Sequence, residues 1–214
     1  TDRVTLDFEA NEGIAEGGVL RFLGVPILAM PALSFAVTDA RKSGWLAPSI
    51  SLDNKSGVEV AVPYYWNIAP QRDATLAPVI SSRRGVGLNS ELRYLEPHHQ
   101  GDVQWHWLPN DRVFDGSRYA LQWRQNGTAF GRGDSDSDSD SWRWGHDGVR
   151  VSDDSYWKDF SRDLRSLTPR LLAFATHAER DANFAGLQTL LYARTQAWQV
   201  LQDADPQVLI VAPY

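Results

Sequence analysis

The sequence has 214 residues, of which 43% are hydrophobic and 11% aromatic, so it can fold as one large domain or as a smaller one joined to part of another. Its formal net charge of −6 argues against a nucleic-acid-binding protein, because neutralising phosphates needs a basic surface. The absence of cysteine excludes thiolate metal sites and disulfides within these residues. No apolar run reaches the roughly 18 residues that a membrane-spanning helix needs.

The first forty residues are predicted to form β-strands, because apolar positions recur with a period of two. Val4, Leu6 and Phe8 alternate with polar partners, and a mostly apolar run, GGVLRFLGVPILAMPALSFAV, follows, broken by Pro26 and Pro31. The sequence opens and closes on segments that resemble strand interiors. We therefore expect a fragment of a longer protein, in which the lack of a signal peptide carries no weight.

From residue 41 onward the chain divides into segments of about ten residues separated by turn-forming residues, the length of a tilted membrane-spanning strand. One face of these segments is expected to be aromatic and aliphatic, with Val58, Val60, Val62, Tyr64, Trp66, Ile68, Leu92, Tyr94, Val103, Trp105, Trp107, Tyr119, Leu121 and Trp123. The other face is polar or small, with Glu91, Arg93, Gln104, His106, Ala120, Gln122 and Arg124.

A soluble β-sandwich would alternate in the same way, with its apolar face turned to the core. The long strands of similar length, and the recurrence of Trp and Tyr toward segment ends, favour an outer-membrane barrel. Periodicity alone leaves the two folds about even. The later segment FAGLQTLLYARTQAWQVLQDAD has helical propensity, and we predict a strand for it because Leu187, Leu191 and Ala193 would then share one face.

Prolines interrupt the strand-like segment VPYYWNIAPQRDATLAP, residues 62 to 78. Proline has no backbone N–H to give to a sheet, so Pro63 and Pro78 are predicted to weaken pairing, whereas Pro70 fits a turn.

We find no pattern that indicates catalysis, a metal or a cofactor. Asp134, Asp136, Asp138 and Asp140 alternate with serine like the start of a calcium loop, but the glycine and distal Glu of such a loop are missing, so a solvated acidic turn is favoured. The five histidines lack metal-ligand spacing and are expected at the surface, and no G-x-S-x-G elbow is present. We expect no enzyme.

Four blocks resemble the family of LPS-assembly proteins called LptD or OstA: DARKSGWLAPSI, VPYYWNIAPQRDATLAP, SRRGVGLNSELRYL and RVSDDSYWKDF. They stand in the family's order and span residues 39 to 160. The resemblance implies an all-β membrane protein with a periplasmic β-jellyroll followed by a large antiparallel outer-membrane β-barrel. Residues 1–40 would be the C-terminal strands of the jellyroll, and residues 41–214 the N-terminal part of the barrel, with the first strand leaving the periplasm.

The resemblance further implies transport of lipopolysaccharide into the outer leaflet of a Gram-negative outer membrane. The expected partners are lipopolysaccharide, a plug lipoprotein (LptE) inside the barrel and a periplasmic bridge protein (LptA) at the jellyroll. Acyl chains would leave through a lateral opening between the first and last barrel strands, where prolines weaken pairing. By motif, these prolines are Pro48 in WLAPSI and Pro63 in VPYYW.

Alternatives remain at each of these sites. Leu20, Phe22, Leu33 and Phe35 could line a lipid path, or could belong to an ordinary sandwich core. Pro48 could mark a strand-end bend, and for Pro78 a kink or bulge is the preferred interpretation. Cysteines common in the family are missing, and the acidic repeat is not part of its pattern. The competing functions are a soluble β-sandwich binding module and a porin-like barrel for small solutes.

Overall fold

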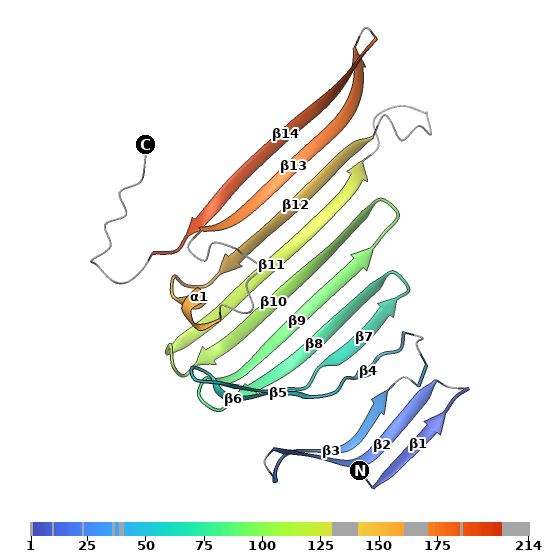
Figure 1. Cartoon of the computed structure of the whole chain (residues 1–214), viewed down its shortest axis with the longest axis vertical. Helices are drawn as coiled ribbons and strands as arrows, with labels where there is room; N and C mark the ends of the chain where they lie inside the picture. Colours follow the sequence, from blue (N-terminus) through green and yellow to red (C-terminus); the bar gives the residue numbers. More distant parts are fainter. Residues whose placement is uncertain are drawn as a thin grey trace.

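A computed structural model describes residues 2–9, 11–22, 24–35, 37–38, 41–129, 141–160, 171–184 and 186–202. The four aspartates of the acidic repeat lie outside this part of the chain. The described residues form two antiparallel sheets and one short helix, which confirms the all-β prediction (Figure 1). None of their helices is long and apolar enough to cross a membrane.

The small sheet contains β1 (Arg3–Asp7), β2 (Glu12–Phe22) and β3 (Val25–Phe35) in chain order. Gly24 has a φ of 83°, a left-handed conformation that suits glycine, and it allows the tight turn between β2 and β3. Gly13 pairs with Phe35 across β2 and β3, and a Cβ at Gly13 would collide with the Phe35 ring. The ring therefore lies directly against the backbone of β2.

The large sheet contains the remaining strands, in an order that follows the chain from one edge to the other. They are β4 (Gly44–Trp45), β5 (Ser49–Asp53), β6 (Gly57–Ala61), β7 (Tyr64–Ala69), β8 (Arg72–Ser81), β9 (Gly85–Leu95), β10 (His99–Asp111), β11 (Gly116–Ala129), β12 (Trp142–Val151), β13 (Leu171–Phe184) and β14 (Leu187–Val200). Helix α1 (Tyr156–Asp159) follows β12. The segment with helical propensity is β14, as predicted, because β13 supplies it with a partner along its whole length.

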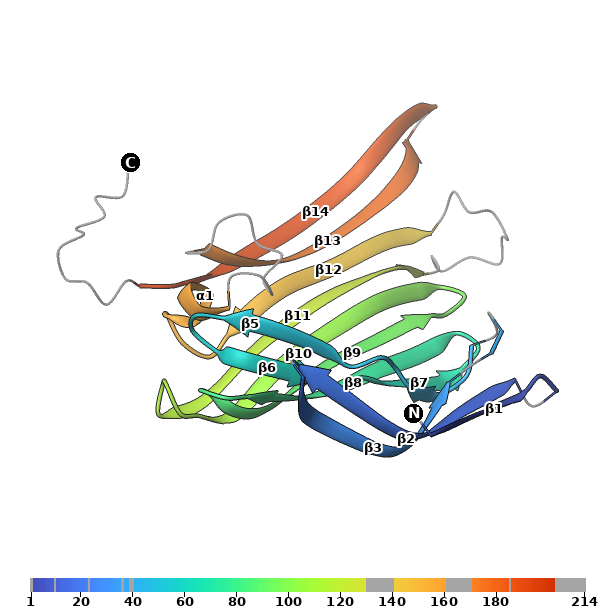
Figure 2. The same cartoon turned by 60° about the horizontal axis from the view of Figure 1, so that its bottom comes forward.

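The large sheet is curved, and α1 lies on its concave side together with β5 and β6 (Figure 2). We call this side the inner face and the opposite side the outer face. The turns at residues 70–71 and 96–98 lie at the end where the chain enters from residue 41, the linker end; those at 54–56, 82–84 and 112–115 lie at the distal end, together with α1.

The pairing register places the predicted apolar positions side by side. Leu92 is opposite Val103, which is opposite Trp123, and the adjacent row joins Trp105 to Leu121. On this outer face Trp66 is 49% exposed and Trp105 41% exposed. Single exposed apolar residues are common, but repeated rows of them indicate a surface that meets another apolar phase.

Candidate functional site

Three prolines lie at the same level of the large sheet. We count β4 with β5 as its first strand, β6 with β7 as its second and β8 as its third, and each of these strands contains one of the prolines. Pro48 separates β4 from β5, Pro63 separates β6 from β7, and Pro78 lies within β8. In the register, Val62 is opposite Pro78, because Ala61 pairs with Val79 and Tyr64 with Leu76. We call this level the proline row. The first two strands are each broken into two pieces there, and the third is continuous.

The first break leaves a single hydrogen bond where an antiparallel sheet can have two. Leu46 donates its N–H to the carbonyl oxygen of Pro63 at 2.8 Å. Residues that pair in this way normally exchange both N–H···O bonds. Pro63 has no N–H to return, so the donor missing from its backbone is the one that would face the first strand.

The same arrangement recurs one strand further into the sheet. Val62 donates its N–H to the carbonyl oxygen of Pro78 at 3.1 Å, and Pro78 cannot donate in return. Of the kink or bulge expected at Pro78, the bulge is absent, because β8 keeps one register with β9 from Arg72 to Ser81. Pro78 removes a hydrogen bond toward the second strand and leaves the pairing register on its other side unchanged.

Pro48 lies in a local irregularity of the first strand. Trp45 pairs with Tyr64 and Ser49 with Ala61, so the three residues 46–48 are opposite the two residues 62–63. One extra residue on one of two paired strands makes a β-bulge, which bends that strand and interrupts its ladder of hydrogen bonds. Pro48 therefore lies where the first strand is least regular.

The predicted lipid-path residues belong to the small sheet. In the register Leu20 is opposite Leu28, Phe22 is opposite Val25, and Leu33 is opposite Ala15. The side chains of Leu20, Phe22 and Leu33 lie outside the described part of the structure. Phe35 is half-buried against Gly13.

An ionic cluster that the sequence pattern does not indicate lies at the distal end on the inner face. Arg118 is fully buried, and it donates from Nε and Nη2 to the two carboxylate oxygens of Asp153, both at 2.9 Å. Its Nη1 also bonds Asp159 at 2.6 Å. Arg84, equally buried, bonds Asp111 at 2.5 Å and Asp159 at 3.2 Å. Strand β11 and the turn between β8 and β9 thus hold α1 and the residues just before it through buried charges that compensate one another.

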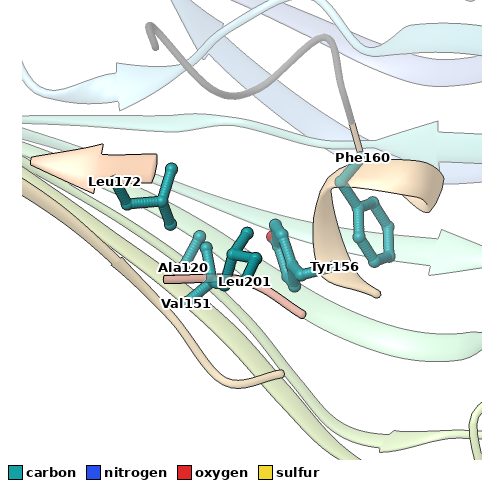
Figure 3. Close-up of a cluster of buried hydrophobic side chains, with 6 residues drawn as sticks. All are labelled: Ala120, Val151, Tyr156, Phe160, Leu172 and Leu201. Carbon is teal, nitrogen blue, oxygen red and sulfur yellow. The ribbon is translucent and has the colours of Figure 1, made fainter. Parts of the chain in front are cut away.

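Apolar contacts complete the attachment of α1. Tyr156 points from the helix toward Ala120, Val151, Leu172 and Leu201, and the ring of Phe160, which follows the helix, packs against Tyr156 with 4.7 Å between ring centroids (Figure 3). The Tyr156 hydroxyl is hydrogen bonded to Nδ1 of His106. The expectation that the histidines lie at the surface is wrong for His106, because α1 covers it. The sequence does place His106 on the polar face of β10, but it does not indicate what covers that face.

The ionic cluster lowers the pKa values of Asp153, just before α1, and of Asp159 within it. Burial alone would raise the pKa of Asp153, but hydrogen bonds from Arg118, Ser152 and Ser155 outweigh burial and hold its pKa below 3.8. Burial likewise opposes ionisation of Asp159, and Arg118 and Arg84 lower its pKa below 3.8. Both carboxylates are therefore charged at neutral pH and anchor the segment.

Polar side chains predominate in the middle of the inner face. A hollow near its middle is lined in part by Asn89, Glu91, Gln104 and Gln122. Gln104 donates to Glu91 at 3.0 Å across β9 and β10. Among the described residues, no group of three or more His, Asp or Glu side chains is arranged to hold a metal ion. Neutral amides and carboxylates on a concave wall suit contact with water or with the polar part of a ligand.

Comparison with known proteins identifies related chains along almost the full length. The LPS-assembly protein LptD of Albidiferax ferrireducens is 44% identical over 213 residues, which cover 99% of this chain and 26% of the relative. The protein of that name from Acidovorax sp. is 43% identical over 224 residues, covering 100% of this chain and 26% of the relative. The one from Burkholderia ambifaria is 37% identical over 212 residues, covering 99% and 25%.

No protein-family model matches the chain. The chain spans about a quarter of the length of the curated relatives that it matches. Identity near 40% across almost every residue, together with the all-β fold in two antiparallel sheets, leaves little room for chance similarity. Over almost its whole length, the chain therefore matches a segment of the proteins named LPS-assembly protein LptD, about a quarter of their length, at 36% to 44% identity.

Proposed function

We propose that this chain is part of an outer-membrane translocon that delivers lipopolysaccharide to the outer leaflet of a Gram-negative bacterium. The observation that carries the proposal is the 36% to 44% identity to proteins named LPS-assembly protein LptD, over nearly the whole chain. Residues 1–40 would be the last strands of a periplasmic jellyroll, and residues 41–214 the first strands of the barrel. The division between the two sheets supports this assignment.

The two faces of the large sheet suit a barrel wall. Outer-membrane strands alternate between lipid-facing apolar residues and polar residues that face the lumen. The outer face carries Trp66, Leu92 and Trp105 in exposed positions, and the inner face carries Glu91 and Gln104. A soluble sandwich would cover such an apolar face with a second sheet, and within the described residues these side chains are exposed.

The proline row supports lateral release between the first and last barrel strands. Unpaired backbone groups in lipid cost several kcal/mol each, so strands that part must have few hydrogen bonds to lose. Pro48 and Pro63 lie where the first two strands are broken, and Pro63 withholds a donor from the first strand. Lipopolysaccharide would be received from the bridge protein LptA and would pass beside the plug LptE, with Leu20, Phe22, Leu33 and Phe35 along the acyl path.

Site-specific photocrosslinking in living cells tests this function. A photoreactive residue at Phe22 or Phe35 of the full-length protein is expected to capture lipopolysaccharide, because these positions lie in the apolar sheet that would carry its acyl chains. A matched probe at Gln71, in an exposed turn of the large sheet, should capture none. Absence of lipopolysaccharide at both phenylalanine positions would contradict transport along the small sheet.

A further inference from the structure

Residues 41–44 connect the two sheets and contact both of them. Arg41 and Ser43 bond to the large sheet, and the residues between and after them, Lys42 and Gly44, meet the small sheet. In an extended chain successive side chains point to opposite sides, so one short segment can hold two partners at once. The proposed function assigns no role to these contacts.

Arg41 makes three contacts with the linker end of the large sheet. Its Nε donates to the Tyr65 hydroxyl at 2.9 Å, its Nη1 donates to the Pro70 carbonyl at 2.9 Å, and its Nη2 forms an ion pair with Asp73. The planar guanidinium supplies these donors from one rigid group, which a lysine could not do. Its position is therefore fixed relative to β7, β8 and the turn between them.

Asp73 is the centre of this attachment. Its side chain is 4% exposed, and it also accepts two hydrogen bonds from Arg93, at 2.8 Å to Oδ1 and 3.1 Å to Oδ2. The Tyr65 hydroxyl donates to the same carboxylate at 3.2 Å. A buried carboxylate requires such partners, because burial without them is costly. Asp73 thus ties the linker segment to the inner face of β8 and β9.

Side chains carry this attachment because the backbone ladder is short. Strand β4 pairs with β7 at two positions, Gly44 with Tyr65 and Trp45 with Tyr64, before the proline row interrupts it. Ser43 extends the contact by accepting the N–H of Asn67 at 2.8 Å, and the Asn67 amide donates to the Arg41 carbonyl at 2.9 Å. The start of the first strand would be loosely held without these groups.

The opposite side of the segment is fitted to the small sheet. Lys42 forms an ion pair with Glu12 of β2 at 3.5 Å, with both side chains half-buried. A Cβ at Gly44 would lie 3.0 Å from the carbonyl oxygen of Ser34 in β3, so only glycine permits this approach without displacement. The two sheets therefore meet at the first strand.

We propose that residues 41–44 form a two-sided latch that fixes the small sheet to the start of the first strand of the large sheet. Asp73 and Arg93 are its anchor on the inner face, and Glu12 and Ser34 are its contacts on the small sheet. The latch holds the small sheet, where the acyl path would end, in a fixed position relative to the first strand of the large sheet, which would border the lateral opening. The small sheet and this strand therefore move as one unit. Asp73 acts as a positioning residue. This inference rests on the proposed function for its role in delivery, but not for its geometry.

Distance measurement between spin labels tests the latch without requiring transport. Labels are placed at Thr5 in the small sheet and Gln71 in the turn after β7 of the full-length protein, both exposed positions outside the latch. Arg41→Ala and Asp73→Asn should each broaden the distribution of label distances at least twofold. Gly44→Ala should shift its mean, because the added methyl group pushes β4 away from β3.

Arg72→Ala is the matched control. It removes the ion pair between the exposed Arg72 side chain and Glu96 at the same end of the sheet and leaves the hydrogen bonds of the latch in place, so the distribution should stay narrow. Thermal unfolding is measured in the same variants, and the barrel should still be folded at the temperature of the distance measurement, which separates loss of alignment from loss of folding.

Delivery of lipopolysaccharide to the cell surface is measured in the same variants. We expect it to fall severalfold in Arg41→Ala and Asp73→Asn and to be normal in Arg72→Ala. An unchanged distance distribution in both latch variants would overturn the latch, and a broadened one with normal delivery would overturn its role in alignment. If the unsubstituted protein delivers no lipopolysaccharide, the proposed function fails, while the distances still decide whether the latch exists.

Discussion

Val62 and Pro78 are joined by one backbone hydrogen bond where an antiparallel pair can have two: Val62 donates at 3.1 Å, and Pro78 has no hydrogen to return. Leu46 and Pro63 show the same one-way pairing between the first and second strands, at 2.8 Å. Backbone hydrogen bonding is therefore weakened at the edge of the large sheet and becomes complete further in. The weakening affects two successive strand contacts, and the pairing of β8 with β9 beyond them is continuous.

Restoring the donor at the first contact should slow release. In the full-length protein, the double substitution Pro48→Ala and Pro63→Ala gives the backbone an N–H facing Leu46 and a more regular first strand. We expect stronger pairing of the first strand and slower delivery of lipopolysaccharide, measured by the rate at which labelled lipopolysaccharide reaches the cell surface. Unchanged delivery in the double variant would remove the gating role of both prolines.

Pro78→Ala should act locally on the second contact. The new N–H can bond the Val62 carbonyl, which adds about 0.5–1.5 kcal/mol, partly offset by about 0.4–1 kcal/mol from the greater freedom of the unfolded chain. Hydrogen exchange should slow at Val62 and stay the same at Leu46. Equal slowing at both amides would mean that the two contacts open together.

Charge placed on the two faces of β11 should have unequal effects. Leu121 lies on the outer face opposite Trp105, and Asn126 is exposed on the inner face opposite Gln100. Lysine on a lipid-facing position near the bilayer centre costs about 2–4 kcal/mol, and an exposed lumen-facing lysine costs little. Leu121→Lys should therefore lower the unfolding free energy in lipid vesicles, with Asn126→Lys as its control. Similar losses in both variants would refute the assignment of the faces.

Removal of the Arg118 guanidinium should release α1 and the residues just before it from the inner face. Arg118→Met leaves Asp153 and Asp159 without a main partner, and breaking a buried ion pair in this way costs about 3–5 kcal/mol. The readout is hydrogen exchange at Phe160, whose N–H donates to the Tyr156 carbonyl at 3.0 Å. Asp154→Ala, next to the cluster but exposed, should leave this exchange unchanged. Continued protection of Phe160 in Arg118→Met would contradict the anchoring role of Arg118.

The same segment should be released by acid. The pKa values of Asp153 and Asp159 are lower in the folded protein than the ordinary 3.8, so their contribution to stability is present above pH 3.8 and is lost as the pH falls through the folded values. Corrected for its intrinsic rate, exchange at Phe160 should be constant from about pH 7 to about pH 5 and should rise only below 3.8. A rise near pH 6 would point to a histidine instead.

Much of the fold could be predicted because the pattern of the strands is local. The alternation of Trp105 and Trp107 with Gln104 and His106 predicts two faces, and the paired registers place these residues as expected. The turn at Pro70 and the strand β14 were also predictable, the first from proline chemistry and the second from a repeated two-residue period. Such patterns depend on neighbours within a few residues, which the sequence displays directly.

The contacts that close the site could not be predicted in this way. Asp73 lies 32 residues from Arg41, and Arg118 lies 35 residues from Asp153. RVSDDSYWKDF matches a motif of the family, but only the antiparallel register of β11 and β12, in which Ala120 is opposite Val151, brings Asp153 next to Arg118. The sequence by itself determined the strands, their two faces and the prolines that interrupt them, because these follow from side-chain alternation and the missing proline N–H. Only the tertiary structure decided which strand each missing donor faces and which buried charges compensate one another, because both depend on register and on segments far apart in the chain.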